Sequence, residues 1–138
     1  MIVLDTNVLS ALMRDAPDPA VVEWLDKLPA ESIWTTSVTV FEIRTGIEQL
    51  TPSRRRTKLE EMFAQLLDED LDGRVQSFDL AAAVAAGPIA ASQRKAGRTV
   101  EIRDVQIAGI AASRRATVAT RNIRHFDGAG VDLMNPWD

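Results

Sequence analysis

Met1-Ile2-Val3-Leu4-Asp5-Thr6-Asn7 is the stretch of sequence that decides the fold, because an apolar run ends there in polar residues. A short run that is apolar throughout is typical of a strand buried on both faces of a parallel sheet. Asp5 then falls at the carboxyl end of that strand, where open parallel sheets bind their ligands. We expect Thr6 or Asn7 to cap a short helix that follows directly.

Strand-like and helix-like patterns alternate along the rest of the chain. Further short segments with strand character lie at 33–35, 75–78, 117–120 and 131–134. Residues 38–50 and 54–70 repeat apolar residues at helical spacing, and an almost wholly apolar helix is expected to begin near Asp104. This alternation predicts one α/β domain over residues 1–138, with a mainly parallel central sheet of four to five strands flanked by helices.

Two local signals refine the helices. Asp18-Pro19 is typical of a helix start, with Asp18 as the cap and Pro19 at the first helical position. Gly87-Pro88 falls in the middle of an alanine-rich segment over 79–96. A proline there is expected to kink or interrupt the helix, because it lacks a backbone N–H and its ring clashes with the preceding turn.

The composition narrows the possible chemistry. The chain has 138 residues, 20 acidic against 16 basic side chains, one His and no Cys. The missing Cys excludes disulfides, thiolate zinc sites and Cys nucleophiles, so an enzyme of this composition is expected to work through carboxylates. The net charge of −4 argues against a protein that binds nucleic acid mainly through its overall charge. No leader and no long apolar run is present, so we expect a cytoplasmic protein without a membrane span.

Carboxylates fall where the predicted fold can bring them to one edge of the sheet. Asp5 ends the first strand, Glu42 interrupts an apolar stretch after the second, and Asp104 lies near the start of the buried helix. Converging acids repel one another, and a hard divalent cation such as Mg²⁺ or Mn²⁺ relieves that repulsion. Three structural alternatives stay open: Asp5 as a helix cap, Asp104 as a charge at a helix N-terminus, and Glu42 in a salt bridge.

Four motifs in the right order resemble those of PIN-domain ribonucleases, specifically the VapC toxin type of bacterial toxin–antitoxin pairs. They are Ile2-Val3-Leu4-Asp5-Thr6-Asn7-Val8-Leu9, Thr39-Val40-Phe41-Glu42-Ile43-Arg44-Thr45-Gly46-Ile47, Arg103-Asp104-Val105-Gln106-Ile107-Ala108 and Ala119-Thr120-Arg121-Asn122-Ile123-Arg124-His125-Phe126. Asn135-Pro136-Trp137 resembles the usual ending of such chains. The resemblance covers nearly the whole chain and implies a single PIN-like nuclease domain.

The resemblance implies a function and a site. It carries Asp5, Glu42 and Asp104 over as catalytic, metal-binding carboxylates that use Mg²⁺ or Mn²⁺ to hydrolyse RNA phosphodiester bonds. Many PIN domains have a fourth acid where this chain has Asn122, which offers a carbonyl oxygen without negative charge. Nearby, Asp127 is expected to close a turn and Glu101 to pair at the surface. The resemblance also implies an antitoxin partner and a homodimer.

Several other polar residues are candidates for auxiliary or substrate-positioning roles. Thr6 and Thr120 are expected to bind waters or phosphate oxygens near the metal, with local capping as the alternative. Asn122 is expected to ligate the metal through its carbonyl oxygen or to position a water. Arg121 and Arg124 are expected to contact RNA phosphates. His125 is expected to make a structural hydrogen bond beyond the site, and the basic cluster 54–58 to be a solvated helix start or a partner-binding surface.

Two other functions remain open from the sequence. An aspartate-nucleophile phosphatase would use Asp5, although such enzymes usually have a second acid where this chain has Asn7. A catalytically silent PIN-like binding module would keep the fold only to hold a partner. The three acids argue against the second function, and Asn122 keeps it open.

Overall fold

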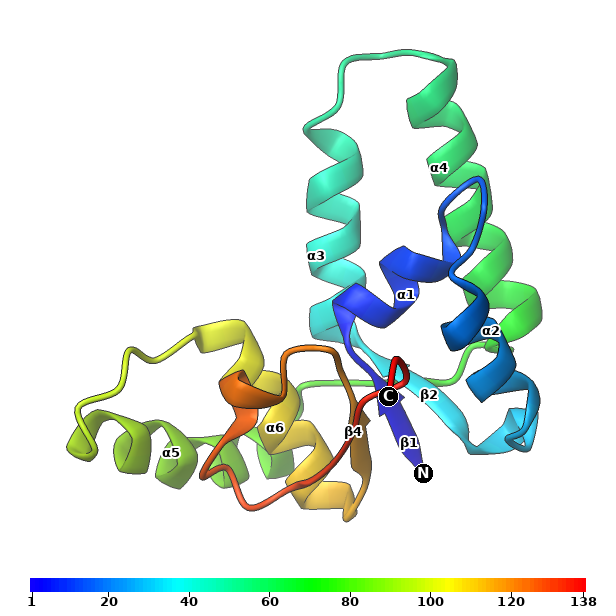
Figure 1. The fold of residues 1–138 in the computed structure, drawn as a ribbon. Helices are drawn as coiled ribbons and strands as arrows, with labels where there is room; N and C mark the ends of the chain where they lie inside the picture. The colour runs from blue at the N-terminus through cyan, green and yellow to red at the C-terminus, as the bar shows by residue number, and fades with distance from the viewer.

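The computed structural model describes residues 1–138 and is built on one parallel sheet (Figure 1). The strand order is β3-β2-β1-β4-β5, and every neighbouring pair is parallel. The strands are β1 (Ile2–Leu4), β2 (Ile33–Thr36), β3 (Val75–Gln76), β4 (Thr117–Ala119) and β5 (Asp132–Met134). The predicted α/β class, the strand positions and the parallel sheet are therefore confirmed.

Six helices and three short helical turns connect the strands. The helices are α1 (Thr6–Leu12), α2 (Pro19–Asp26), α3 (Ser37–Glu48), α4 (Arg54–Gln65), α5 (Leu80–Lys95) and α6 (Ile102–Arg114). The turns are η1 (Ala30–Ser32), η2 (Leu66–Asp70) and η3 (Ile123–Phe126). Asp18 caps α2 and Pro19 is its first residue, as predicted. The cap of α1 is Asp5, whose carboxylate accepts the Thr6 N–H, so the capping role considered for Asp5 is present and the expected cap by Thr6 or Asn7 is wrong.

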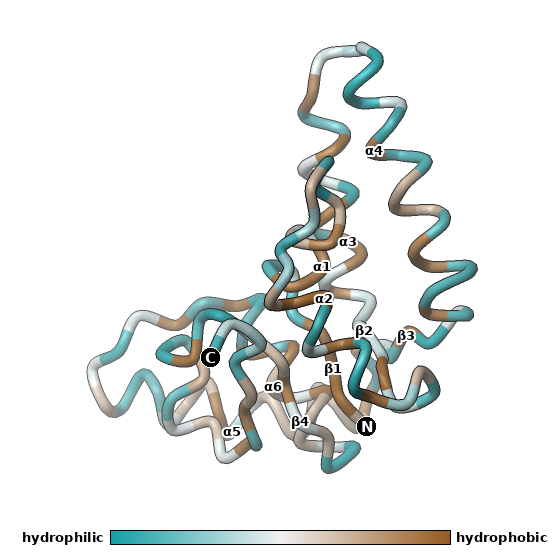
Figure 2. The backbone as a smooth tube through the Cα atoms, turned by 45° about the vertical axis from the view of Figure 1, so that its right-hand side comes forward, coloured by the Kyte–Doolittle hydropathy of each residue, from teal (hydrophilic) through white to brown (hydrophobic).

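The sheet separates two apolar cores, and β1 contributes to both. Successive side chains of a strand point to opposite faces, so Val3 packs on the α5–α6 side while Leu4 packs against α1 to α4. Both side chains are buried, which explains why the opening stretch is apolar at every position. In Figure 2 the apolar segments follow the sheet and the inner faces of the helices. The burial of β1 on both faces fixes Asp5 at the edge where the strand ends.

Helix α5 is continuous through Pro88, so the predicted interruption is wrong. The missing proline N–H costs one helical hydrogen bond. Burial of one face of α5 against α6 offsets that cost, through Ala82, Ala86 and Ile89. The two helices approach closely at Gly109 of α6, where an added Cβ would lie 2.6 Å from the Ala82 carbonyl oxygen.

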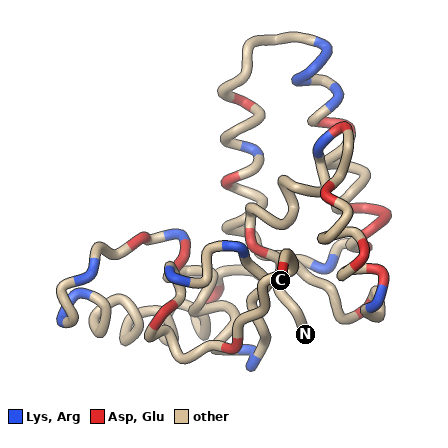
Figure 3. The backbone as a smooth tube through the Cα atoms, in the orientation of Figure 1, with Lys and Arg blue, Asp and Glu red and all other residues tan.

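Helices α3 and α4 form a hairpin that stands away from the sheet (Figure 1). Lys and Arg gather at its tip (Figure 3), where the basic cluster 54–58 begins α4. Arg56 bonds to Glu48 and Glu60 and donates to the Leu50 carbonyl, so this arginine joins the two helices. Phe63 of α4 is buried in the apolar core that this hairpin shares with α1 and α2.

No helix of the chain is both long and apolar enough to cross a membrane.

Candidate metal and phosphate site

A pocket of about 500 Å³ opens where β1 and β4 end. We refer to it as the site pocket. Its lining comes from α1, α3, the start of α6, the segment after β4 and the C-terminal end. The lining residues are Asp5, Thr6, Asn7, Ser10, Arg14, Glu42, Glu101, Arg103, Asp104, Arg121, Asn122, His125 and Trp137. The three acids identified from sequence therefore line the same pocket, as parallel strands with their carboxyl ends at one edge allow.

Asp5 is almost fully buried at the floor of the site pocket, with 3% of its surface exposed. One carboxylate oxygen accepts the Thr6 N–H at 2.8 Å, and the other accepts the Thr120 hydroxyl at 2.8 Å and the Asn7 amide at 3.0 Å. Burial raises the pKa of Asp5 above its ordinary value, and these hydrogen bonds oppose the rise. The carboxylate is thus held in one orientation by residues from two strand ends.

Asp104 lies in the first turn of α6 and faces the same pocket. Burial, followed by the neighbouring charge of Asp5, raises the pKa of Asp104 to about 6. The His125 ring nitrogen Nδ1 lies 2.8 Å from an Asp104 carboxylate oxygen and partly offsets that rise. His125 was expected to bond beyond the site, but it is part of the pocket lining. The charge of Asp5 therefore disfavours the charged form of Asp104.

Glu42 projects from α3 and makes two polar contacts. The Thr6 hydroxyl donates to its Oε1 at 3.1 Å, and Arg103 lies 3.4 Å from its Oε2. The salt bridge considered for Glu42 is therefore present, with an arginine from the start of α6. The pair is partly exposed at the wall of the site pocket, so a ligand in the pocket can compete for Glu42.

The oxygen donors of this pocket suit a hard divalent cation in type. Asp5, Glu42, Glu101 and Asp104 all line it, and hard cations prefer carboxylate oxygens. No three of these side chains stand in an arrangement that could hold one ion, because Glu42 engages Thr6 and Arg103 while Asp104 engages His125. The donor atoms are of the type that a divalent cation prefers. In this structure the carboxylates are hydrogen-bonded or ion-paired to protein groups and are not arranged around one ion.

The auxiliary candidates separate into three groups by position. Asn122 and Arg121 line the site pocket alongside Thr6. Thr120 is fully buried behind it, where its hydroxyl donates to Asp5 and accepts the Asn122 N–H at 2.9 Å. Arg124 lies outside, in a neighbouring polar pocket that it shares with His125. Thr120 therefore acts on Asp5 and has no surface to offer a phosphate.

Other lining residues were not singled out from the sequence. They are Ser10, Arg14, Arg103 and Trp137. Glu101, expected to pair at the surface, forms no ion pair and lines the pocket instead. Two of them were within reach of sequence reasoning: Arg103 directly precedes Asp104 in the third motif, and Ser10 follows Thr6 by one turn of α1. Trp137 reaches the pocket only through the packing of a distant segment.

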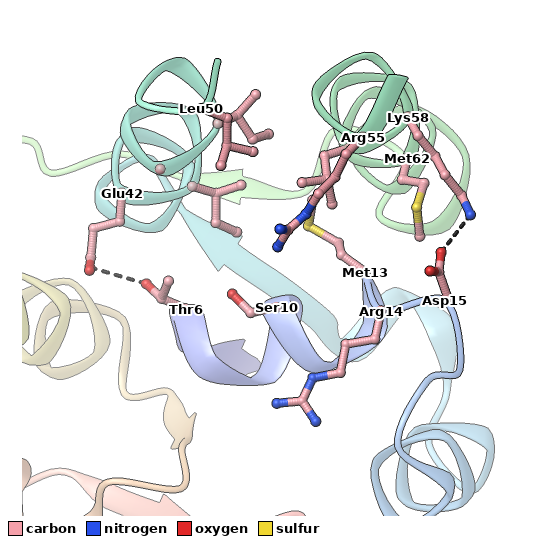
Figure 4. A pocket seen from close by; sticks show the side chains of 14 residues that line it. Thr6, Ser10, Met13, Arg14, Asp15, Glu42, Leu50, Arg55, Lys58 and Met62 are labelled. Carbon is pink, nitrogen blue, oxygen red and sulfur yellow. Dashed lines mark hydrogen bonds and ion pairs between the residues drawn. The ribbon is translucent and has the colours of Figure 1, made fainter. Parts of the chain in front are cut away.

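A groove of about 790 Å³ continues from the site pocket between α1, α3 and α4 (Figure 4). Thr6, Ser10, Arg14 and Glu42 line both the pocket and the groove. The groove has an apolar floor that includes Ile43, Ile47 and Met62, with Arg55 and Lys58 at its α4 side. Lys58 pairs with Asp15 across it. The site pocket therefore opens into an amphipathic groove.

Known proteins share this sequence and fold over their full length. The model of the PIN domain matches residues 2–130. The chain is 36% identical to "VapC ribonuclease Y4jK" of Sinorhizobium fredii, covering 100% of this chain and 99% of the relative. It is 38% identical to "Plasmid stability protein StbB" of Pseudomonas syringae, with the same coverage. The crystal structure of FitAcB from Neisseria gonorrhoeae superposes with a TM-score of 0.89 at 35% identity, covering 99% of both chains.

These similarities extend over the elements that carry the site. The matched residues 2–130 include β1, α3, α6 and β4, from which Asp5, Glu42 and Asp104 are positioned. Sequence motifs, sheet order and the convergence of the three acids thus agree with the family match. The chain belongs to the PIN-domain family.

Proposed function

We propose that this protein is a divalent-metal-dependent endoribonuclease and the toxin of a toxin–antitoxin pair. The observation that carries the proposal is the convergence of Asp5, Glu42 and Asp104 on one pocket from three separate elements. Relatives named "VapC ribonuclease Y4jK" and "Toxin FitB" share more than a third of their residues with this chain and support the same conclusion.

The raised pKa of Asp104 supports a cation in the pocket. Burial beside Asp5 makes two negative charges costly, and a divalent cation would remove that cost. Asp5, Glu42 and Asp104 would hold Mg²⁺ or Mn²⁺, and Asn122 adds a neutral carbonyl oxygen on the same wall. A bound cation of this kind supplies activation of a water molecule and offsets charge on the phosphodiester.

The chain's own residues prepare the site for this chemistry. Thr120 and Asn7 hold the Asp5 carboxylate, so its orientation is set before any ligand arrives. Arg103 and Thr6 keep Glu42 at the wall of the pocket, and Arg121 brings positive charge to it. The net charge of −4 therefore does not describe the pocket, where arginines lie beside the carboxylates. An RNA phosphate that enters the pocket can contact these arginines.

The phosphatase alternative is disfavoured by the surroundings of Asp5. An attacking carboxylate must expose an oxygen to the phosphorus, but Asp5 is 3% exposed and accepts three hydrogen bonds. Asn7, at the place of the second acid of such phosphatases, donates one of them. The residue therefore orients Asp5 instead of serving as an acid.

Asp104→Asn is the sharpest test of the nuclease proposal, because the amide keeps the size of the side chain and removes the charge. We expect the variant to lose at least about 100-fold in cleavage of single-stranded RNA with Mg²⁺ or Mn²⁺. Mn²⁺ should also raise the melting temperature of the wild type and leave that of the variant unchanged. Asp132→Asn, an exposed carboxylate on β5, is the matched control. Undiminished cleavage by Asp104→Asn would overturn the proposed site.

The groove supports an antitoxin as the partner. Its apolar floor and basic α4 side suit an amphipathic segment with acidic residues, and the groove leads directly to Glu42. A segment that fills the groove would therefore also cover the entrance of the site pocket. Similar solved structures include FitAB bound to a DNA fragment, with a TM-score of 0.90 and 35% identity.

An exposed apolar face supports self-association. We define it by Phe41, Leu80, Val84 and Ile102, whose surfaces are 53–81% exposed. The Phe78 N–H donates to Ser37 Oγ at 3.1 Å, so the starts of α3 and α5 adjoin. Arg103, next to Ile102, pairs with Glu42, next to Phe41, so α6 adjoins α3 as well. Large exposed apolar side chains gathered in this way mark interaction surfaces, and we assign this face to the expected homodimer.

A further inference from the structure

The C-terminal end folds back onto the site pocket. After β5, the Trp137 N–H donates to the Asn135 side chain at 3.0 Å, and the Asp138 N–H donates to the Asn135 carbonyl at 3.2 Å. Pro136 between them is buried. This turn holds the Trp137 indole at the pocket, although Trp137 is the penultimate residue of the chain.

The Trp137 indole joins two other parts of the molecule. Its Nε1–H donates to Asp18 Oδ2 at 2.8 Å, while Asp18 Oδ1 caps α2 by accepting the Ala20 N–H at 3.1 Å. The Arg121 guanidinium carbon lies 4.7 Å from the centroid of the Trp137 ring. A guanidinium stacked on an aromatic ring loses side-chain freedom but keeps its N–H groups available at the edge.

Arg121 is also fixed through its backbone, on the side of the catalytic carboxylate. Its N–H donates to Asn7 Oδ1 at 2.9 Å, and the amide of the same Asn7 donates to Asp5 Oδ2 at 3.0 Å. A single side chain therefore connects the Arg121 backbone to Asp5. The main chain of Arg121 is held relative to the carboxylate, and its side chain is held relative to Trp137.

The charge of Arg121 has no carboxylate partner. Arg103, in the same pocket, pairs with Glu42, whereas Arg121 forms no ion pair. Asp18 is engaged by the indole and by the cap of α2. The hydrogen bond from the indole, with a smaller contribution from the charge of Arg121, lowers the pKa of Asp18 without an ion pair between Asp18 and Arg121. A guanidinium that is oriented, forms no ion pair and lies beside the carboxylates of the pocket is suited to a phosphate, which it can bind through two N–H groups.

We propose that Trp137 is a positioning residue for Arg121, and that Arg121 held in this way binds a phosphate of the RNA substrate. The inference rests on the proposed nuclease function for the identity of the ligand. Trp137 acts through Arg121: the ring limits the guanidinium to orientations that face the pocket. Asp18 sets the plane of the ring by accepting the indole N–H.

The test measures binding and cleavage separately. Binding of a pool of short, fluorescently labelled single-stranded RNAs is followed by anisotropy in EDTA over a range of salt concentrations, and cleavage is followed with Mn²⁺. Arg121→Ala should weaken binding roughly 10-fold, because a charge-assisted contact is lost. It should also reduce the slope of log K against log salt by about 0.7, the value for one phosphate on a single strand.

The tryptophan variants decide whether Trp137 positions Arg121. Trp137→Leu should reproduce most of the loss in affinity and in salt slope, and Trp137→Phe, which keeps a ring under the guanidinium, should recover part of both. The double variant Trp137→Leu/Arg121→Ala should bind no more weakly than Arg121→Ala alone, because residues that act through one another are not additive. Arg94→Ala, an exposed arginine at the end of α5, is the control.

Each alternative result has its own meaning. If Trp137→Leu lowers the melting temperature but leaves affinity and salt slope unchanged, Trp137 only anchors the C-terminus and the inference is wrong. Additive losses in the double variant also overturn it, as does wild-type protein that binds no RNA. Wild-type protein that binds RNA through Arg121 and Trp137 but does not cleave it would overturn the proposed nuclease function and leave this inference standing.

Discussion

The Thr120 hydroxyl donates a 2.8 Å hydrogen bond to Asp5 Oδ2, which joins two fully or almost fully buried residues 115 positions apart in the chain. Thr120 follows β4 and Asp5 follows β1, and these two strands pair in the centre of the sheet. The same hydroxyl accepts the Asn122 N–H at 2.9 Å. One side chain therefore couples the carboxylate to the segment that carries Arg121.

Thr120→Val keeps the shape of the side chain and removes this coupling. We expect the free energy of unfolding at pH 7 to fall by about 1–3 kcal/mol, because a buried carboxylate and a backbone N–H each lose a partner. Thr120→Ser retains the hydroxyl and is expected to lose less. Chemical denaturation measures both values, and equal losses in the two variants would show that the hydrogen bond is unimportant.

Asp104 predicts an unusual dependence of stability on pH for the metal-free protein. Its pKa is about 6 in the folded chain against 3.8 as the ordinary value, so the folded state binds more protons in between. The contribution of Asp104 to stability should therefore be greatest below pH 3.8 and should be lost as the pH rises through about 6. The difference amounts to about 3 kcal/mol at most, since one pKa unit corresponds to about 1.4 kcal/mol.

Asp104→Asn removes this titration and provides the check. In EDTA the variant should be more stable than the wild type at pH 7.5, and the advantage should shrink towards about pH 3, below the ordinary pKa of 3.8, where the aspartic acid is largely neutral in both states. Thermal unfolding at several pH values measures the difference. A constant difference over this range would mean that the pKa of Asp104 is not raised.

The close approach of α5 and α6 at Gly109 allows the free-energy cost of forcing these helices apart to be measured. An alanine Cβ there would lie 2.6 Å from the Ala82 carbonyl oxygen and 2.7 Å from the Ala86 Cβ, so one helix must move. Gly109→Ala should lower the free energy of unfolding by about 1–3 kcal/mol. Gly46→Ala on α3 meets nothing within 4 Å and should instead stabilise by about 0.5–1 kcal/mol. A neutral Gly109→Ala would contradict the observed approach.

Gly46 also provides a test of the proposal that the groove binds the antitoxin. It lines the groove, and a side chain added there points into open space. Gly46→Trp should therefore fold normally, retain RNA cleavage within about twofold, and bind the cognate antitoxin at least about 100-fold more weakly. Calorimetry of the purified pair measures the affinity, with Gly46→Ala as the control for loss of the glycine. Unchanged affinity would remove the groove from the interface.

The apolar face is tested by charge. Leu80→Glu and Val84→Glu place a carboxylate on residues that are 81% and 68% exposed, so the isolated fold should tolerate them. If this face forms the homodimer, the double variant should be monomeric by light scattering at concentrations where the wild type is dimeric. Ala83→Glu, which adds the same charge on α5 next to these residues, is the control variant. A dimeric double variant would place the interface elsewhere.

Much of the fold followed from local pattern. The run Ile2–Leu4 predicted a buried parallel strand because its burial on both faces requires apolar residues throughout. Pro88 misled the prediction because the packing of α5 on α6, which local sequence does not encode, outweighs one lost hydrogen bond. Asp5, and not Thr6 or Asn7, caps α1, because β1 ends at Leu4 and the helix already begins at Thr6.

The site was predictable only in part. The motifs located the three carboxylates and Arg121, all of which line one pocket. They did not indicate that His125 bonds to Asp104 or that Trp137 stacks on Arg121. Arg124, expected beside the site, faces a neighbouring pocket because η3 directs it away.

By itself, the sequence determined the order of strands and helices and the acids at the carboxyl edge of the sheet. Hydrophobic periodicity and short motifs act over a few residues, so they are readable without coordinates. The tertiary structure alone decided which side chains meet there. Burial beside Asp5 raises the pKa of Asp104, and Trp137 reaches Arg121 only after β5 has joined the sheet. Such effects depend on desolvation and contact between distant segments, which exist only in the folded chain.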